Sequence, residues 1–150
     1  MRNDDMAVYK NAVKVIEEYL TELCVMDASE HVKPGKYRVV FNNWEGHCES
    51  SVVIYIDPDT MRLIYKMYYN VNPVTEEQKT TLTDHFHWVN ETFIRDRCTG
   101  GIEDNGAIYV KVEHSCALYG LTSEHIKMFE KICTERIVSD RFEIKKFIKG

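Results

Sequence analysis

The sequence lacks any long apolar run. No stretch approaches the roughly 18 apolar residues that a membrane-spanning helix needs. The first ten residues, MRNDDMAVYK, are polar and acidic with no apolar centre, so they do not form a secretory signal. The cysteines number five, and no two of them form a CxxC pair, which favours free thiols in a reducing compartment. We therefore expect a cytoplasmic, soluble protein with no membrane partner.

Basic residues are also in short supply. The chain has 19 lysines and arginines against 24 aspartates and glutamates, for a net charge of −5. Nucleic-acid binding usually needs a concentrated basic surface. Lys145, Lys146 and Lys149 gather near the end of the chain, but aspartates and glutamates lie nearby. We expect no nucleic-acid partner.

Sequence motifs that specify a reaction are missing. There is no nucleophile elbow or cysteine-hydrolase signature. Gly100-Gly101 is not followed by the lysine and serine or threonine of a phosphate-binding loop, so a strand entry or a bulge is the better interpretation. Glu76-Glu77 falls in the first turn of a predicted helix, where the helix dipole favours carboxylates. We predict no catalytic residue and no cofactor.

The histidines leave a metal site as an open alternative. His85 and His87 are two apart on a predicted helix and project about 200° from each other, so they cannot share an ion there. His114 and Cys116 are two apart near the end of a strand and face the same side. Zinc would need two further ligands, and His47 and Cys48 could supply them from a distant loop. Ordinary structural or surface roles are favoured, so we predict no metal ligand.

Cysteine chemistry is the second open alternative. Cys116 or Cys98 could act as a nucleophile with a histidine base brought close by the fold. Cys24 and Cys133 fall on or beside apolar helix faces, where a thiol acts as a small hydrophobic group. A Cys/His-based enzyme or metal-binding protein is therefore the alternative to a protein that has no reaction centre.

Length and composition fit one folded unit. A chain of 150 residues with 44% hydrophobic and 29% charged residues is ordinary for a globular domain and long enough to bury a sizeable core. No internal repeat, low-complexity segment or linker interrupts it. We predict a single domain over residues 1–150.

Apolar residues recur at helical spacing in three segments, with a short fourth at the end. The first begins at Asp4 or Asp5 and carries Tyr9, Val13, Ile16, Leu20 and Leu23. The second begins with a capping box at Thr75, runs to about Ile94 and carries Leu82, Phe86, Val89 and Phe93. The third begins at Thr122 or Ser123 and carries Ile126, Phe129, Cys133 and Ile137, a stripe that Met128 and Ile132 broaden. A short tail helix from Ser139 would hold Phe142 and Phe147.

Five segments have the alternation or the β-branched and aromatic content of strands. They are Tyr37–Asn42, Glu49–Ile56, Met61–Tyr69, Arg95–Ile102 and Ala107–Ser115. Met26–Lys36 is a predicted connector, and Glu103–Gly106 is a predicted hairpin turn. The order α-β-β-β-α-β-β-α predicts an α+β domain with a five-stranded antiparallel sheet covered by helices.

The third predicted strand is the richest in aromatic residues. Tyr65, Met67 and Tyr69 share one face of it, while Ile64 and Tyr68 lie on the other. The first face is either core or an interface, with core favoured. If helices cover only one side of the sheet, the second face is exposed and suited to binding. These residues are the candidate partner or dimer interface: Ile64, Tyr65, Met67, Tyr68 and Tyr69.

The run VNETFIRDRCTGGIEDNGAIYVKVEHSCALYGLTSEHIKMFEKI resembles the YbjN family of bacterial sensory transduction regulators. The matching positions are Asn90 near the end of the middle helix, the turn Asp104-Asn105-Gly106, and Gly120-Leu121-Thr122-Ser123-Glu124 at the start of a helix. The resemblance is specific over Val89–Ile137 and topological over the first 70 residues. The matching residues are turn and cap positions and imply no catalysis.

That family is similar in fold to the type III secretion chaperones, which share the same order of elements. The resemblance implies a small, acidic, cytoplasmic homodimer that binds extended segments of a protein partner. We therefore expect a non-enzymatic, chaperone-like regulatory protein that binds through its sheet or helix surfaces, by strand addition or in a groove.

Overall fold

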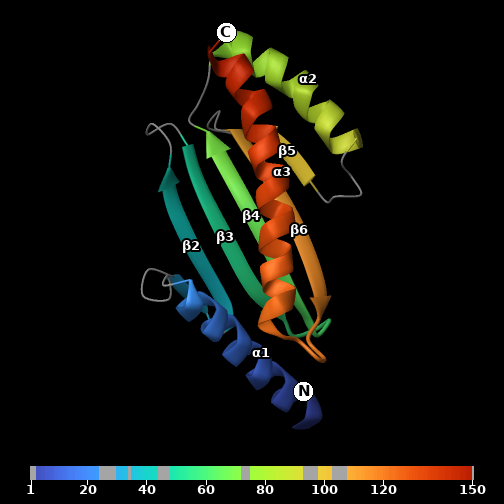
Figure 1. Cartoon of the computed structure of the whole chain (residues 1–150). Coiled ribbons are helices and arrows are strands. Elements are labelled where there is room, and N and C mark those ends of the chain that lie inside the picture. Colours follow the sequence, from blue (N-terminus) through green and yellow to red (C-terminus); the bar gives the residue numbers. More distant parts are fainter. Residues whose placement is uncertain are drawn as a thin grey trace.

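An antiparallel sheet of six strands forms the centre of the computed structural model (Figure 1). The structure describes residues 3–23, 30–33, 35–43, 48–71, 75–92, 98–102 and 108–149. The strands are β1 (Glu30–Lys33), β2 (Lys36–Asn43), β3 (Cys48–Asp57), β4 (Arg62–Val71), β5 (Cys98–Ile102) and β6 (Ile108–Ala117). Their spatial order is β1-β2-β3-β4-β6-β5.

The five predicted strands are present, and all neighbours pair antiparallel. The first three predicted strands form a meander, with continuous registers of β2 with β3 and of β3 with β4. The sixth strand, β1, lies in the segment Met26–Lys36 that we predicted as a connector. It has only four residues, too few for a recognisable alternation, and it pairs with the start of β2. The predicted turn Glu103–Gly106 lies outside the described residues.

Three helices lie on one side of the sheet (Figure 1). They are α1 (Asn3–Glu22), α2 (Glu76–Thr92) and α3 (Ser123–Lys149). The predicted short tail helix from Ser139 is wrong, because α3 continues without a break to Lys149. Ser139 is therefore an interior helical position and does not cap a new helix. No helix within the described ranges is both long enough and apolar enough to cross a membrane.

The core lies between the sheet and the helices. Helix α1 buries Ile16 and Leu20 as predicted, but Leu23 follows the helix and is 42% exposed. Helix α3 buries Ile126, Phe129 and Cys133. Met128 and Ile132, which we expected to broaden the apolar stripe of this helix, are instead exposed to solvent. Their positions turn toward the outer side of α3 because the sheet contacts only a narrow face of the helix.

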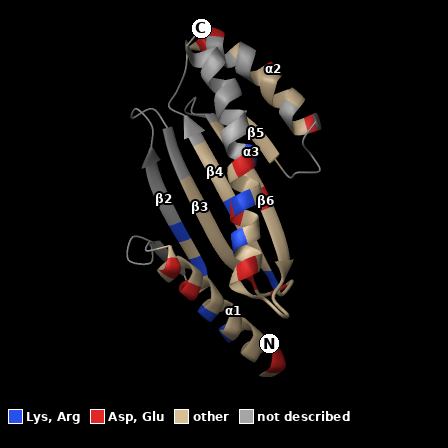
Figure 2. Cartoon of the chain, viewed as in Figure 1, with Lys and Arg blue, Asp and Glu red and all other residues tan. Residues whose placement is uncertain are grey.

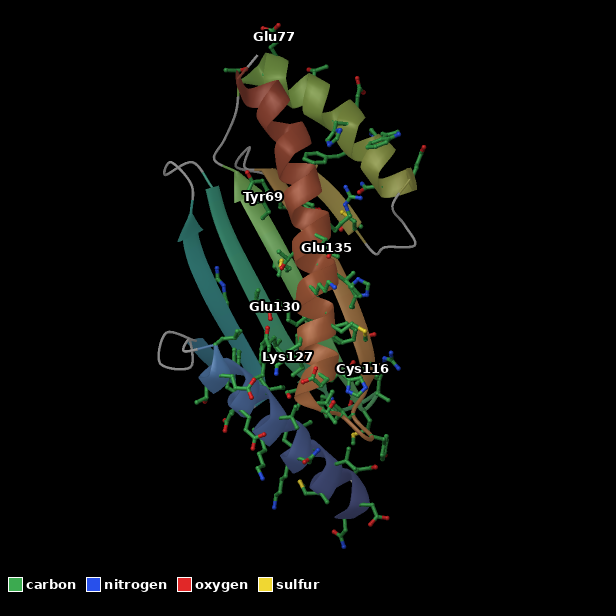
Figure 3. All side chains as sticks on the ribbon, in the orientation of Figure 1. Tyr69, Glu77, Cys116, Lys127, Glu130 and Glu135 are labelled. Atoms are coloured by element: carbon green, nitrogen blue, oxygen red, sulfur yellow. The ribbon has the colours of Figure 1, made fainter. Side chains whose placement is uncertain are left out.

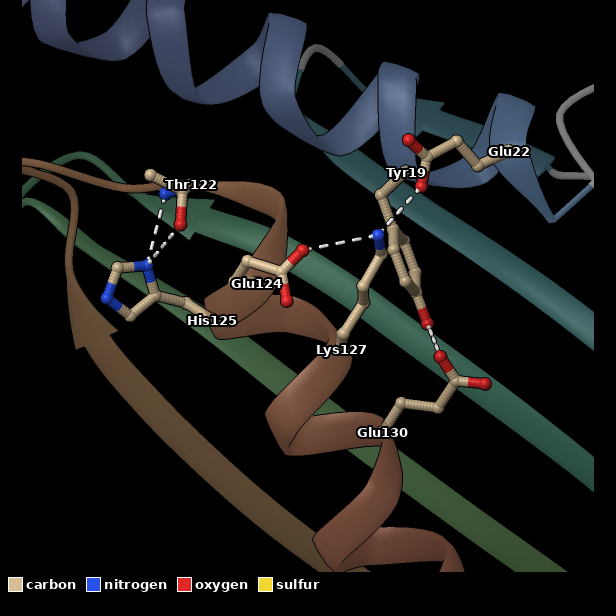
Figure 4. Close-up of polar contacts among 7 residues, drawn as sticks. All are labelled: Tyr19, Glu22, Thr122, Glu124, His125, Lys127 and Glu130. Atoms are coloured by element: carbon tan, nitrogen blue, oxygen red, sulfur yellow. Dashed lines mark hydrogen bonds and ion pairs between the residues drawn. The ribbon is translucent and has the colours of Figure 1, made fainter.

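Polar contacts join α1 to α3 over the core (Figure 4). The Tyr19 hydroxyl donates a hydrogen bond to Glu130, and burial together with that carboxylate raises the pKa of Tyr19. Lys127 Nζ lies 3.1 Å from a Glu22 carboxylate oxygen and 3.4 Å from one of Glu124. The first of these ion pairs connects the two helices, so a buried tyrosine and an exposed lysine together fix the position of α1.

Candidate functional site: the uncovered face of the sheet

The strand registers divide the sheet residues into two faces. Side chains alternate along each strand, and residues paired across strands point to the same side. Tyr37, Ile54, Tyr65 and Val112 are buried on the side of the helices. None of the described elements covers the other side, and its described side chains are half-buried or exposed except that of Ser51, which is 3% exposed. We call this side the uncovered face. Its described side chains include Lys36, Arg38, Val53, Tyr55, Asp57, Arg62, Ile64, Lys66, Tyr68, Tyr109, Lys111, Glu113 and Ser115.

The predicted interface residues divide between the two faces. Tyr65 and Tyr69 are each 1% exposed and Met67 is 9% exposed. Figure 3 shows Tyr69 on β4, beside α3. These three side chains belong to the core, so their inclusion in a surface available to a partner is corrected: helix α3 packs over them. Ile64 and Tyr68 lie on the uncovered face.

An apolar centre occupies the middle of the uncovered face. Tyr55 on β3 pairs with Ile64 on β4, and Val53 lies two residues before Tyr55 on the same face. Tyr68 follows Ile64 along β4, four residues later. All four side chains are half-buried. Aromatic and aliphatic side chains of this kind are enriched where proteins contact partners.

Lysines flank this apolar centre. The ammonium of Lys36 lies 5.4 Å from the centroid of the Tyr55 ring, and that of Lys66 lies 5.2 Å from it. Lys66 also forms an ion pair of 3.4 Å with Glu113. Burial lowers the pKa of Lys66, but the hydrogen bond to Tyr55 and the nearby acidic groups outweigh it, so the pKa is raised overall. Lys66 therefore stays charged at neutral pH.

At the centre of the edge strand β5, a side chain of α2 bonds the backbone groups that face away from the sheet. Gly100 N–H donates a hydrogen bond of 2.8 Å to Asn90 Oδ1, and Asn90 Nδ2 donates one of 3.2 Å to Gly100 O. The amide of Asn90 thus occupies both groups that an added strand would use at this residue. Sequence reasoning found Asn90 as a matching position but did not identify this contact, because it depends on how α2 packs against β5.

The two glycines of β5 make room for aromatic rings on opposite faces. A Cβ atom on Gly100 would lie 2.4 Å from Cδ1 of the buried Phe86. A Cβ atom on Gly101 would lie 2.8 Å from the hydroxyl oxygen of Tyr109 on the uncovered face. Gly100 and Gly101 lie inside β5 in a continuous register with β6, so the expected strand entry or bulge is wrong.

The cysteines and histidines that were candidates for a Cys/His-based reaction centre lie mainly against the core. His114 and Cys116 lie on the same side of β6, and the His114 ring stacks on Phe129 at 5.7 Å between centroids. Burial raises the pKa of the Cys116 thiol, although Arg62 lowers it in part. Burial raises the pKa of Cys133 to about 12. Nucleophilic cysteines need the opposite shift.

The remaining candidate ligands do not converge in the described part of the chain. His85 is half-buried beside Phe86 and Trp88, while His87 is exposed. Cys98 is fully buried in β5. Among the described residues there is no group of three or more His, Cys, Asp or Glu side chains that could hold a metal ion. His47 lies outside the described residues, as does the side chain of Cys48.

Comparisons with known proteins find similar solved structures, including the two that follow. A chain of the ExsC–ExsE complex has 10% sequence identity and a TM-score of 0.49, and the alignment covers 81% of this chain and 86% of the other. A chain of the HopA1–SchA chaperone–effector complex has 11% identity and a TM-score of 0.49, with 100% and 99% covered. No family model matches the sequence, and no curated protein matches it.

Proposed function

We propose that this chain is a non-enzymatic protein-binding protein of the YbjN type, with a chaperone-like regulatory role in the cytoplasm. The observation that carries the proposal is the arrangement of the sheet: helices pack on one face, and the other presents Tyr55, Ile64 and Tyr68 without a covering element in the described structure. Half-buried aromatic and aliphatic side chains on an open sheet are stabilised when a partner removes them from water.

Docking on the face is favoured over addition of a strand at β5. Strand addition needs unpaired N–H and C=O groups along an edge. At Gly100 both groups are bonded to Asn90, so a partner strand could not pair through the centre of β5. A partner that lies across the uncovered face needs none of these groups. The apolar centre would then supply affinity, and the polar residues around it would supply orientation.

A capture experiment tests the role of this face. Wild-type protein, Tyr68→Asp and the control Leu23→Asp are immobilised and incubated with native cell extract, and retained proteins are quantified by mass spectrometry. Leu23 is 42% exposed beyond the end of α1, so its variant adds the same charge away from the sheet. We expect a partner that wild type and Leu23→Asp retain equally, and that Tyr68→Asp retains about tenfold less, since a carboxylate at the centre of a contact is costly.

Two results would contradict the proposal. One is a retained set that does not change with Tyr68→Asp while the variant keeps its circular dichroism spectrum. The other is a turnover activity that is lost on substitution of Cys116 or His114, because that would support the Cys/His-based enzyme.

A further inference from the structure

The charges on the uncovered face differ in sign from those of the molecule as a whole. The chain carries a net charge of −5. Among the described side chains of this face, however, cations outnumber carboxylates. The cations are Lys36, Arg38, Arg62, Lys66 and Lys111, and the carboxylates are Asp57 and Glu113. Figure 2 shows basic positions on β2 and a mixture of acidic and basic positions on α1 and α3.

The cations alternate with apolar residues along the central strand. On the uncovered face, β4 presents Arg62, Ile64, Lys66 and Tyr68 in that order. Side chains on one face of a strand are spaced by about 6.6 Å, twice the rise per residue. Lys111 pairs with Tyr68 across to β6, which adds a cation beside the last apolar residue. The face therefore has a repeating pattern of positive and apolar positions.

We propose that the uncovered face binds an extended acidic segment of a protein partner, with carboxylates four residues apart and an apolar side chain midway between them. An extended segment repeats its own side chains on one side at the same spacing of about 6.6 Å as β4. Its carboxylates then meet Arg62 and Lys66, and its apolar side chains meet Ile64 and Tyr68. This inference rests on the proposed function and specifies the chemistry of the partner.

A single-stranded nucleic acid fits this face less well. Bases bind open sheets by stacking on free aromatic rings. The ring of Tyr55 already has the ammonium groups of Lys36 and Lys66 near it, at 5.4 and 5.2 Å from its centroid. Glu113 forms an ion pair with Lys66, so it repels a phosphate and a carboxylate alike and does not distinguish the two partners.

Peptide selection tests the inference directly. A phage-displayed library of random peptides is panned on the immobilised full chain, and the enriched sequences are read. We expect aspartate or glutamate at positions i and i+4 with an apolar or aromatic residue at i+2. The best peptide is then synthesised with a fluorescent label, and its affinity is measured by anisotropy at low and high salt. Binding should weaken as salt increases, because the pairs lie at a solvent-exposed surface.

A matched pair of charge-reversal variants locates the site. Arg62→Glu with Lys111→Glu reverses two cations of the uncovered face. Lys10→Glu with Lys131→Glu makes the same change in net charge at exposed positions of α1 and α3. We expect the first variant to bind the labelled peptide about tenfold more weakly and the second to bind it as wild type does. Circular dichroism of both variants shows that they remain folded.

The outcomes separate this inference from the proposed function. Enriched peptides that are neutral or basic, or equal losses in the two charge-reversal variants, overturn the acidic partner and leave the proposed function standing. No enrichment on wild type contradicts both. A labelled oligothymidylate that binds more tightly than the best peptide also overturns the inference, in favour of nucleic acid. Peptide binding that Tyr68→Asp does not weaken would move the site away from this face.

Discussion

Gly100 and Gly101 are adjacent residues with different neighbours. Gly100 faces the core, where the Phe86 ring is 3% exposed and cannot move away without opening a cavity. Gly101 faces the uncovered side, where the contact is with the outer end of Tyr109. The two adjacent glycines therefore make room for different rings. The buried Phe86 ring beside Gly100 has less space to move than the Tyr109 ring beside Gly101.

We expect Gly100→Ala to lower the free energy of unfolding by roughly 1–3 kcal/mol, the usual cost of an overpacked core. Gly101→Ala should cost less, because the half-buried Tyr109 side chain can rotate toward solvent. Urea unfolding of the two variants and wild type measures the difference. Equal losses would mean that Tyr109 is held as firmly as Phe86.

The faces of β4 were predictable from its sequence. Alternation placed Tyr65, Met67 and Tyr69 together and Ile64 and Tyr68 opposite them, and the structure shows this division. The sequence favoured the first set as core, and its burial agrees with that preference. Both sets contain tyrosine beside an aliphatic or thioether side chain, so hydrophobicity alone does not distinguish core from surface on this strand.

Among the secondary-structure elements, β5 and α2 depend on each other. Strand β5 has five residues and lies at the edge of the sheet, and α2 seals its outer side through Asn90. A sealed edge resists pairing with a second chain. The side-chain amide supplies one donor and one acceptor, as a peptide group of a neighbouring strand would.

Asn90→Ala should lower the free energy of unfolding by roughly 1–3 kcal/mol, because two polar backbone groups at Gly100 lose their partners. The variant should also aggregate faster, since the edge becomes available. Asn90→Asp keeps an acceptor for the Gly100 N–H and should be intermediate. Urea unfolding and static light scattering measure the two effects, with Glu91→Ala as an exposed control on the same helix.

An Asn90→Ala variant as stable and as soluble as wild type would show that the rest of α2 protects the edge without the amide.

Long elements with a clear period were easier to predict than short ones. The stripe of Ile126, Phe129 and Cys133 indicated α3, and its residues are buried as expected. The end of that helix was missed, because Ser139 looked like a cap although α3 continues through it to Lys149. Strand β1 was missed because it is too short to show alternation and is defined by its pairing with β2.

At the scale of the whole molecule, we propose that two copies associate. Met128 and Ile132 lie one turn apart on α3 and are 51% and 39% exposed, on the side of the helix away from the sheet. A second copy that packs against this pair would remove both from water. This surface is separate from the uncovered face, so a dimer would leave both copies free to bind a partner.

Light scattering after size exclusion tests the dimer. We expect wild type to have twice the 17.6 kDa mass of the chain, and Ile132→Glu to have the mass of one chain. Met6→Glu, at a residue 43% exposed on α1, is the matched control and should remain a dimer. A monomeric wild type would contradict the homodimer, and a dimeric Ile132→Glu would contradict the surface on α3.

The basic character of the uncovered face could not be predicted from composition. Its cations come from β2, β4 and β6, and they are gathered by the pairing of β2 with β3, of β3 with β4 and of β4 with β6. The acidic total of the chain concealed them, because nine carboxylates on α1 and α2 outnumber the three cations there. The order of elements predicted the antiparallel α+β class. The charge of the uncovered face depends on which residues the strand registers place on that side, and the sequence alone does not give those registers.

This separation of charge gives the molecule an electric dipole, with its positive end at the sheet and its negative end at the helices. In solution such a dipole turns an approaching acidic chain toward the sheet before the two touch. The rate of encounter would then depend on the field of the folded protein, while the lifetime of the complex would depend on the apolar residues at its centre.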